Sequence, residues 1–145
     1  GHADNALPQS ATVSINCRIF PGVDPASVQA KLQEIAGHSV ELKLIGQPTW
    51  SAPSPLREDV FGAVTRVVHS MHPGLQVVPL QESGATDGMF FRAVGIPTYG
   101  VGGTFIKTSD EFAHGLNERI PVQSFYDGVE HWYRLIKELA GQKTP

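Results

Sequence analysis

The first third of the chain alternates apolar and polar positions in two places. Residues 11–20 set valine, isoleucine and cysteine on one face, which predicts a strand with one side in water. Residues 40–44 alternate in the same way. Between them, Asp24 and Pro25 predict the start of a helix, and Gly37 predicts its end. The pattern indicates a strand–helix–strand unit whose sheet is covered on one face.

The pattern changes after residue 47, where helical periods alternate with short apolar runs. We expect helices from a Ser54 cap to about residue 71, over 89–94 and over 122–140, and strands over 75–80 and 96–101. This order predicts α/β layers. In the last helix, one apolar stripe is expected to face inward: Phe125, Val129, Trp132, Leu135, Ile136 and Leu139.

Residues 47–55 separate the two halves, because they hold three prolines, two serines and a tryptophan. The sequence therefore predicts two units, one over residues 3–47 and one over residues 48–145.

The composition excludes some classes of binding partner. Charged residues make up 17% of the chain, below the usual ~25%, which suggests that part of the surface is covered. The net charge is −3 and no block of Lys and Arg appears, so nucleic acid is not expected as a partner. No apolar run approaches the ~18 residues of a membrane span, so no membrane partner is expected either. The single cysteine, Cys17, excludes an internal disulfide.

Few residues suggest chemistry on their own. His114 lies in a glycine-containing loop before the last helix and is either a metal ligand or a turn residue. Residues 83–88 are expected to form a turn at the start of a helix. This turn is either an anion-binding site or a capped tight turn. Arg18 suits a carboxylate, or is an exposed strand residue. Asn5 alone indicates only a turn before a strand. No general base is recognisable.

Taken together, these segments resemble a known family. Asn5-Ala6-Leu7-Pro8 precedes a strand that ends Asn16-Cys17-Arg18, Ser83-Gly84-Ala85-Thr86-Asp87 precedes Gly95-Ile96-Pro97, and His114-x-x-Asn117-Glu118 follows. In this order they resemble motifs in the C-terminal half of the M20 family of zinc-dependent metallopeptidases and amidohydrolases.

The resemblance implies a fold. Residues 48–145 would be the C-terminal part of an α/β, three-layer zinc-exopeptidase-like catalytic domain, which is incomplete here. Residues 3–47 would be the strand–helix–strand portion of an α+β lid or dimerisation domain.

The resemblance also implies roles for particular residues. His114 would be a ligand of one of two zinc ions, with Co²⁺ and Mn²⁺ as alternatives. Asn5 and Arg18 would hold a substrate carboxylate, and Gly84 and Thr86 would line the substrate pocket. Asp87 and Glu118 are expected to play only supporting roles.

The implied reaction is hydrolysis of an amide bond next to a free carboxylate, in a peptide or an N-acyl amino acid. The other metal ligands and the general base of the family are not found in this chain. We therefore expect no catalytic residue here, and no activity from these residues alone. We expect the chain to form a homodimer or to associate with a missing N-terminal half.

Two rival interpretations stay open. The chain could be a non-catalytic dimerisation module, or a small-molecule or peptide-binding α/β domain unrelated to M20. Both a cytoplasmic and a periplasmic or secreted location are compatible with the sequence.

Overall fold

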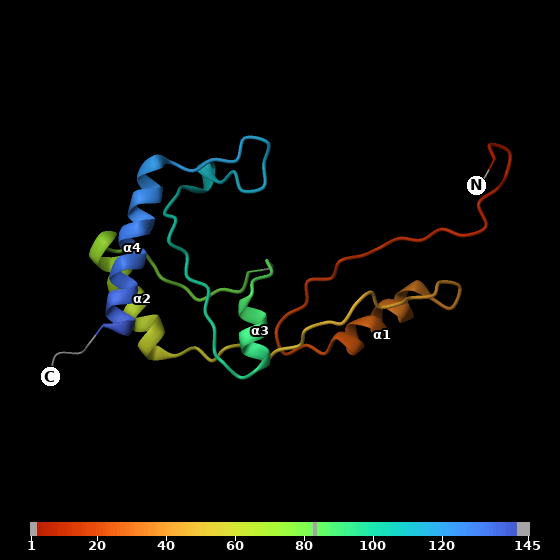
Figure 1. Ribbon diagram of the computed structural model, residues 1–145, viewed down its shortest axis with the longest axis horizontal. Coiled ribbons are helices and arrows are strands. Elements are labelled where there is room, and N and C mark those ends of the chain that lie inside the picture. The colour runs from red at the N-terminus through yellow and green to blue at the C-terminus, as the bar shows by residue number, and fades with distance from the viewer. Residues whose placement is uncertain (1–2, 83, 142–145) are drawn as a thin grey trace.

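The computed structural model is an open arrangement of helices joined by long non-helical segments (Figure 1). It describes residues 3–82 and 84–141. The helices are α1 (Pro25–Ala36), α2 (Glu58–Met71), α3 (Gly88–Ala93), the short 3₁₀ helix η1 (Thr108–Asp110) and α4 (Val122–Ala140). Among the described residues, no helix is both long and apolar enough to cross a membrane.

The four segments predicted as strands form no β-ladder in the described part of the chain. Residues 11–20, for example, run as a single extended arm away from α2, α3 and α4 (Figure 1). Alternation of apolar and polar residues favours an extended backbone, but a strand also needs a partner for its N–H and C=O groups. The helical elements of the predicted α/β pattern are therefore present, whereas its sheet is not confirmed.

The start of α1 follows from the sequence. The Asp24 side chain accepts a hydrogen bond from the Ala26 N–H at 3.0 Å, and Pro25 occupies the first turn. This satisfies one of the amide groups that a helix start leaves unpaired. The predicted cap is confirmed.

The expected Ser54 cap of α2 is wrong, because that hydroxyl is used elsewhere. Helix α2 begins at Glu58, and its N-cap residue Arg57 makes no side-chain cap bond. Ser54 Oγ instead donates to the Thr98 carbonyl at 2.8 Å and accepts from the Thr98 N–H at 2.9 Å. The two bonds tie the segment before α2 to the segment after α3.

A small core lies between α2 and α4, which are the two elements in extensive contact. Ala63, Val67 and Leu135 are buried in it. Val64, Met71 and Val101 pack against them and are partly buried. Helix α2 therefore contributes most of this core, and α4 contributes Leu135.

Residues 101–106, which we call the strap, cross α4 at close range. Ser124 Oγ donates to the Phe105 carbonyl at 2.6 Å. One turn further on, a Cβ added at Gly128 would lie only 2.6 Å from the Gly103 carbonyl oxygen. The strap can therefore approach α4 this closely only because residue 128 has no side chain.

Most apolar side chains are left in contact with solvent. The accessible surface is 12247 Å², against about 7,300 Å² for a compact monomer of this mass. The inward stripe predicted for α4 is correspondingly wrong for five of its six residues: Leu135 is buried, but the others are exposed. The strap and α2 cover the side of α4 that carries Ser124, Gly128 and Leu135, and the five exposed residues lie beside that side.

We expect Gly128→Ala to destabilise the packing of the strap on α4. The added methyl group would meet a backbone oxygen that cannot move independently, and overpacking of this kind typically costs about 1–3 kcal/mol. The change is measured as the free energy of unfolding by denaturant.

Gly62→Ala on α2 is the matched control. There the new Cβ would meet only the far end of the Arg66 side chain, at 3.2 Å. Alanine is the better helix former, by about 0.5–1 kcal/mol, so this variant should be neutral or more stable. Equal losses from both substitutions would contradict the close approach at Gly128.

His131 is a buried imidazole within this packing. Its side chain is fully buried, and neither ring nitrogen has a hydrogen-bond partner among the described residues. Its ring packs edge-on against Phe105, with 5.4 Å between centroids, and the His72 ring packs against the same ring at 4.2 Å, tilted by 41°. Burial, followed by the charge of His72, lowers the pKa of His131 below its ordinary value of 6.5.

We therefore expect the free energy of unfolding to decrease as the pH is lowered below about 6.5, where the histidine of the unfolded chain takes up a proton. The folded state, with its lowered pKa, binds fewer protons in this range, so acid favours unfolding. One proton contributes at most about 1.4 kcal/mol per pH unit. Unfolding free energies between pH 7.5 and 5.5 should show a smaller slope for His131→Leu. The slope should be unchanged for His38→Leu, at the exposed turn after α1.

Candidate functional site

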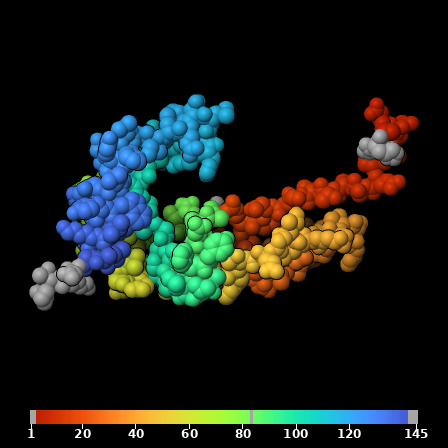
Figure 2. Space-filling view, in the orientation of Figure 1, coloured from red at the N-terminus to blue at the C-terminus, as the bar shows by residue number. Residues whose placement is uncertain are grey.

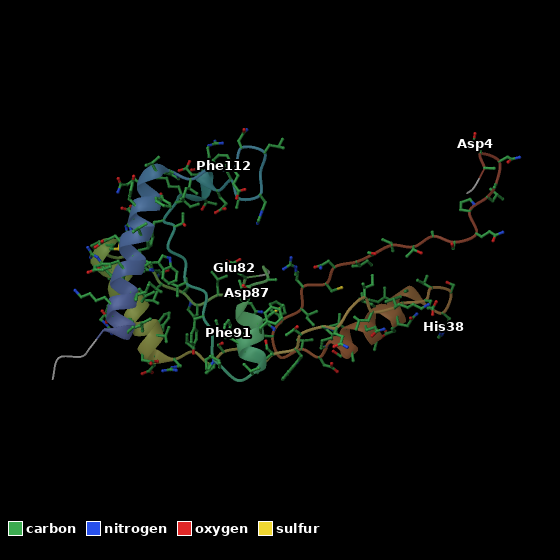
Figure 3. The ribbon with its side chains drawn as sticks, viewed as in Figure 1. Asp4, His38, Glu82, Asp87, Phe91 and Phe112 are labelled. Carbon is green, nitrogen blue, oxygen red and sulfur yellow. The ribbon has the colours of Figure 1, made fainter. Side chains whose placement is uncertain are left out.

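The residues predicted to bind substrate and metal lie in three separate parts of the structure. Asn5 and Arg18 are on the N-terminal arm, Gly84 and Thr86 precede α3, and His114 lies in the loop after η1. All five are exposed. Figure 3 shows this separation through their labelled neighbours, with Asp4, Asp87 and Phe112 far from one another. The structure does not bring the predicted site together, and these assignments stay predictions.

Two open hollows of the described chain lie elsewhere. One, of about 540 Å³, lies between α2 and α4 and is lined largely by charged side chains of Arg66, Arg134, Lys137 and Glu138. The other, of about 460 Å³, lies between α2 and residues 74–78. Neither is lined by a predicted site residue.

Arg18 is oriented by a local contact on the arm. Its Nε donates to Asn16 Oδ1 at 3.1 Å, and both residues are exposed. This bond does not use the two Nη groups of the guanidinium. Paired donors of this kind suit a carboxylate, which Arg commonly binds in bidentate fashion.

The turn before α3 is a tightly packed start to a short helix. The Met89 N–H donates to the Thr86 carbonyl at 3.2 Å, and the Phe90 N–H donates to the Asp87 carbonyl at 3.0 Å. Gly88 is buried, and a Cβ there would lie 3.1 Å from both Thr86 Oγ1 and Thr98 Cγ2. Asp87 makes no side-chain cap bond, so its carboxylate is not used in starting the helix.

The loop that carries His114 has an unusual backbone. His114 has φ 60°, and it is the one non-glycine residue with positive φ in the described ranges. This left-handed conformation costs energy for a residue with a Cβ, and it is often retained at functional sites. The turn is closed by the Gly115 N–H, which donates to the Phe112 carbonyl at 3.1 Å.

Phe112 and Arg119 bracket this turn and were not singled out from the sequence. The guanidinium of Arg119 lies 3.5 Å from the centre of the Phe112 ring. Arg119 also donates from Nη1 to the Asn117 carbonyl at 3.1 Å. An aromatic residue and an arginine, one on each side of a His-Gly turn, could have indicated this contact.

The donor set does not fit a metal centre by itself. A zinc site takes three or four protein donors. Within residues 3–82 and 84–141, no group of three or more His, Cys, Asp or Glu side chains is placed to hold a metal. His114 offers one imidazole, and further donors would have to join it.

We expect the contact between Phe112 and Arg119 to hold the His114 turn closed. An exposed cation–π contact contributes about 0.5–1 kcal/mol, so Arg119→Ala should accelerate exchange of the Gly115 amide hydrogen by about two- to fivefold. NMR-detected hydrogen exchange measures this. Arg119→Lys keeps the charge but loses the planar group and should lie between. Unchanged exchange in Arg119→Ala would show that the turn closes without this contact.

Comparison with known proteins places the chain in a family. The model of the peptidase family M20/M25/M40 matches residues 4–138. Human aminoacylase-1 is 29% identical over 97% of this chain and 35% of its own length. The human N-fatty-acyl-amino acid synthase/hydrolase PM20D1 is 26% identical over 97% of this chain and 29% of its own length.

No solved structure gives a significant match. The chain spans about a third of the length of the curated relatives it matches. Because the family model covers residues 4–138, and so nearly the whole chain, the chain belongs to the peptidase family M20/M25/M40.

Proposed function

We propose that this chain is part of a hydrolase that cleaves an amide bond next to a free carboxylate, with N-acyl amino acids as its substrate class. The family match over residues 4–138 carries the proposal. The names of the two relatives, an aminoacylase and an N-fatty-acyl-amino acid synthase/hydrolase, point to acylated amino acids rather than to long peptides.

In this proposal, Arg18 and Asn5 hold the carboxylate of the substrate. A charged, bidentate hydrogen bond between guanidinium and carboxylate is both strong and directional. Gly84 and Thr86 line the pocket beside the carboxylate, where the exposed turn before α3 leaves backbone groups accessible. The exposure of all four residues is compatible with a ligand, although they do not meet in the described arrangement.

His114 is proposed as one zinc ligand, with Co²⁺ or Mn²⁺ as alternative metals. Its exposed position on a strained turn leaves the imidazole accessible to a metal ion whose other ligands lie elsewhere. The described residues do not complete a metal site. The proposal therefore assigns the other donors, and the base that activates water, to polypeptide beyond these 145 residues. It follows that these residues alone do not hydrolyse the substrate.

A second candidate is a non-catalytic dimerisation module. The observation that favours it is the large accessible surface of 12247 Å², much of it apolar. A module of this kind would associate, but it would not influence turnover through Arg18 or His114. Kinetic measurements on variants of these two residues therefore separate the candidates.

We expect Arg18→Met to weaken binding of substrates with a free carboxylate. In a polypeptide of the relatives' full length that carries these 145 residues, KM for an N-acetyl amino acid should rise about ten- to a hundredfold. KM for the corresponding C-terminal amide should change little, because the charged partner is already absent. Arg57→Met, which removes an exposed arginine before α2, is the control. Equal effects on the two substrates would contradict carboxylate binding by Arg18.

In the same polypeptide, His114→Ala should lower kcat/KM for the acid substrate by at least about a hundredfold, because the loss of a ligand weakens binding of the metal ion. His38→Ala is the matched control and should leave the rate unchanged. Full activity in His114→Ala would favour the dimerisation module. Turnover by the 145 residues alone would contradict the assignment of the missing groups to other polypeptide.

A further inference from the structure

The short segment 51–55, which we call the junction, is hydrogen-bonded to both of the predicted units. The Gly22 N–H, in the first unit, donates to the Ser51 carbonyl at 2.9 Å. Arg92 Nε, on α3 in the second unit, donates to Ser51 Oγ at 3.3 Å. Ser51 is only 6% exposed. Figure 2 shows α3, in green, beside the red arm and the yellow segment that precedes α2. Ser51 therefore has one partner in each unit.

The junction also holds the segment that follows α3. Ser54 Oγ is bonded to both backbone groups of Thr98, and the Tyr99 hydroxyl donates to the Pro55 carbonyl at 2.7 Å. Arg92 adds a contact from the last turn of α3 itself. The position of α3 is therefore set by its bonds to the junction.

Arg92 also lies against the turn that carries the proposed pocket residues. A Cβ added at Gly88, the first residue of α3, would lie 3.2 Å from Arg92 Nη1 and 3.1 Å from Thr86 Oγ1. The guanidinium and the Thr86 side chain are therefore beside the same buried position. Through its Nε the half-buried Arg92 side chain is bonded to the junction, and through its end it contacts the turn before α3.

We propose that Arg92 is a positioning residue for the proposed hydrolysis and acts through Ser51. This inference rests on the proposed function, in which Arg18 holds the substrate carboxylate and Thr86 lines the pocket. These two residues belong to different units, so a substrate that contacts both requires a fixed relation between the units. Ser51 supplies this relation. Its carbonyl is bonded to Gly22, four residues beyond Arg18, and its hydroxyl is bonded to the helix that follows Thr86.

An arginine suits this position better than a lysine. The guanidinium presents its donors in one rigid plane, so Nε stays on Ser51 while Nη1 lies against the turn at Gly88. A lysine ammonium is a single point charge on a flexible stem and can occupy only one of these places at a time. Arg92→Lys is therefore expected to keep only part of the positioning effect.

The test uses a polypeptide of the relatives' full length that carries these 145 residues. For each variant, kcat/KM is measured on one sample for an N-acetyl amino acid and for its C-terminal amide, and the acid-to-amide ratio is taken. Arg92→Met should lower this ratio about tenfold and Ser51→Ala about threefold, because a displaced pocket fits poorly to a substrate whose carboxylate Arg18 holds. Arg92→Lys should lie between Arg92→Met and the wild type.

Arg134→Met is the matched control. Arg134 is also a helical arginine that donates to a serine hydroxyl, that of Ser70 at 3.0 Å, but it lies on α4. Its replacement should leave the ratio unchanged. If Arg92 only stabilised the fold, both rates would fall in proportion and the ratio would stay constant, because the ratio does not depend on the fraction of folded enzyme.

A second comparison repeats Arg92→Met in an Arg18→Met background. Once the carboxylate is no longer held, displacement of the pocket should affect the acid and the amide equally, so the ratio should not fall further. A further tenfold fall in this background would mean that Arg92 acts on the carboxylate without Arg18, and it would overturn the positioning role.

The positioning role and the proposed function fail in different ways. If the wild type does not turn over the N-acetyl amino acid, or if Arg18→Met leaves the ratio unchanged, the proposed function is wrong and the positioning role falls with it. If Arg18→Met lowers the ratio but Arg92→Met and Ser51→Ala leave it at the wild-type value, only the positioning role is overturned.

Discussion

The contact between α2 and α4 beneath the strap is the interaction that organises residues 58–141. The strap is held on α4 by a position without a side chain, Gly128, and by the Ser124 hydroxyl, which donates to the Phe105 carbonyl. Leu135 fills the space between the helices, and His131 lies on the same side of α4. Because α2 and the strap occupy this side of α4, the apolar residues on the neighbouring side stay exposed to solvent.

The same geometry explains why the proposed site is dispersed. A few hydrogen bonds join segments of the described chain that are distant in sequence, such as the Gly22 N–H to the Ser51 carbonyl at 2.9 Å and the pair between Ser54 and Thr98. These tie neighbouring segments together, but none brings the arm to the His114 loop. A hydrolytic centre needs its groups within a few ångströms of one another. The dispersed positions of these residues are compatible with membership of the M20/M25/M40 family if polypeptide beyond these 145 residues brings them close to one another.

Local features could be predicted from the sequence, and long-range ones could not. The Asp24 cap and both ends of α4 follow from neighbouring residues, and the structure confirms them. Ser54 has the right type and position for a cap, but a residue 44 positions away competes for its hydroxyl. The predicted strands are not confirmed for a related reason, because alternation specifies an extended segment but not the partner that makes it a strand.

The candidate site shows the same division. Its residues came from motif order, which the family match supports as a whole without testing any single residue. The contact of Arg119 with Phe112 was missed, although an aromatic residue and an arginine flank the His-Gly turn. The positive φ of His114 was not predicted either, because only a small fraction of histidines adopt it, although histidine is enriched there among non-glycine residues.

The most direct measurement is a calorimetric titration of Zn²⁺ into the 145-residue chain, with His114→Ala beside it. If these residues supply one ligand of a site completed elsewhere, binding should be weak and should differ little between the two proteins. Tight, stoichiometric binding that His114→Ala abolishes would contradict this. It would mean that one chain, or a pair of chains, already completes the metal site.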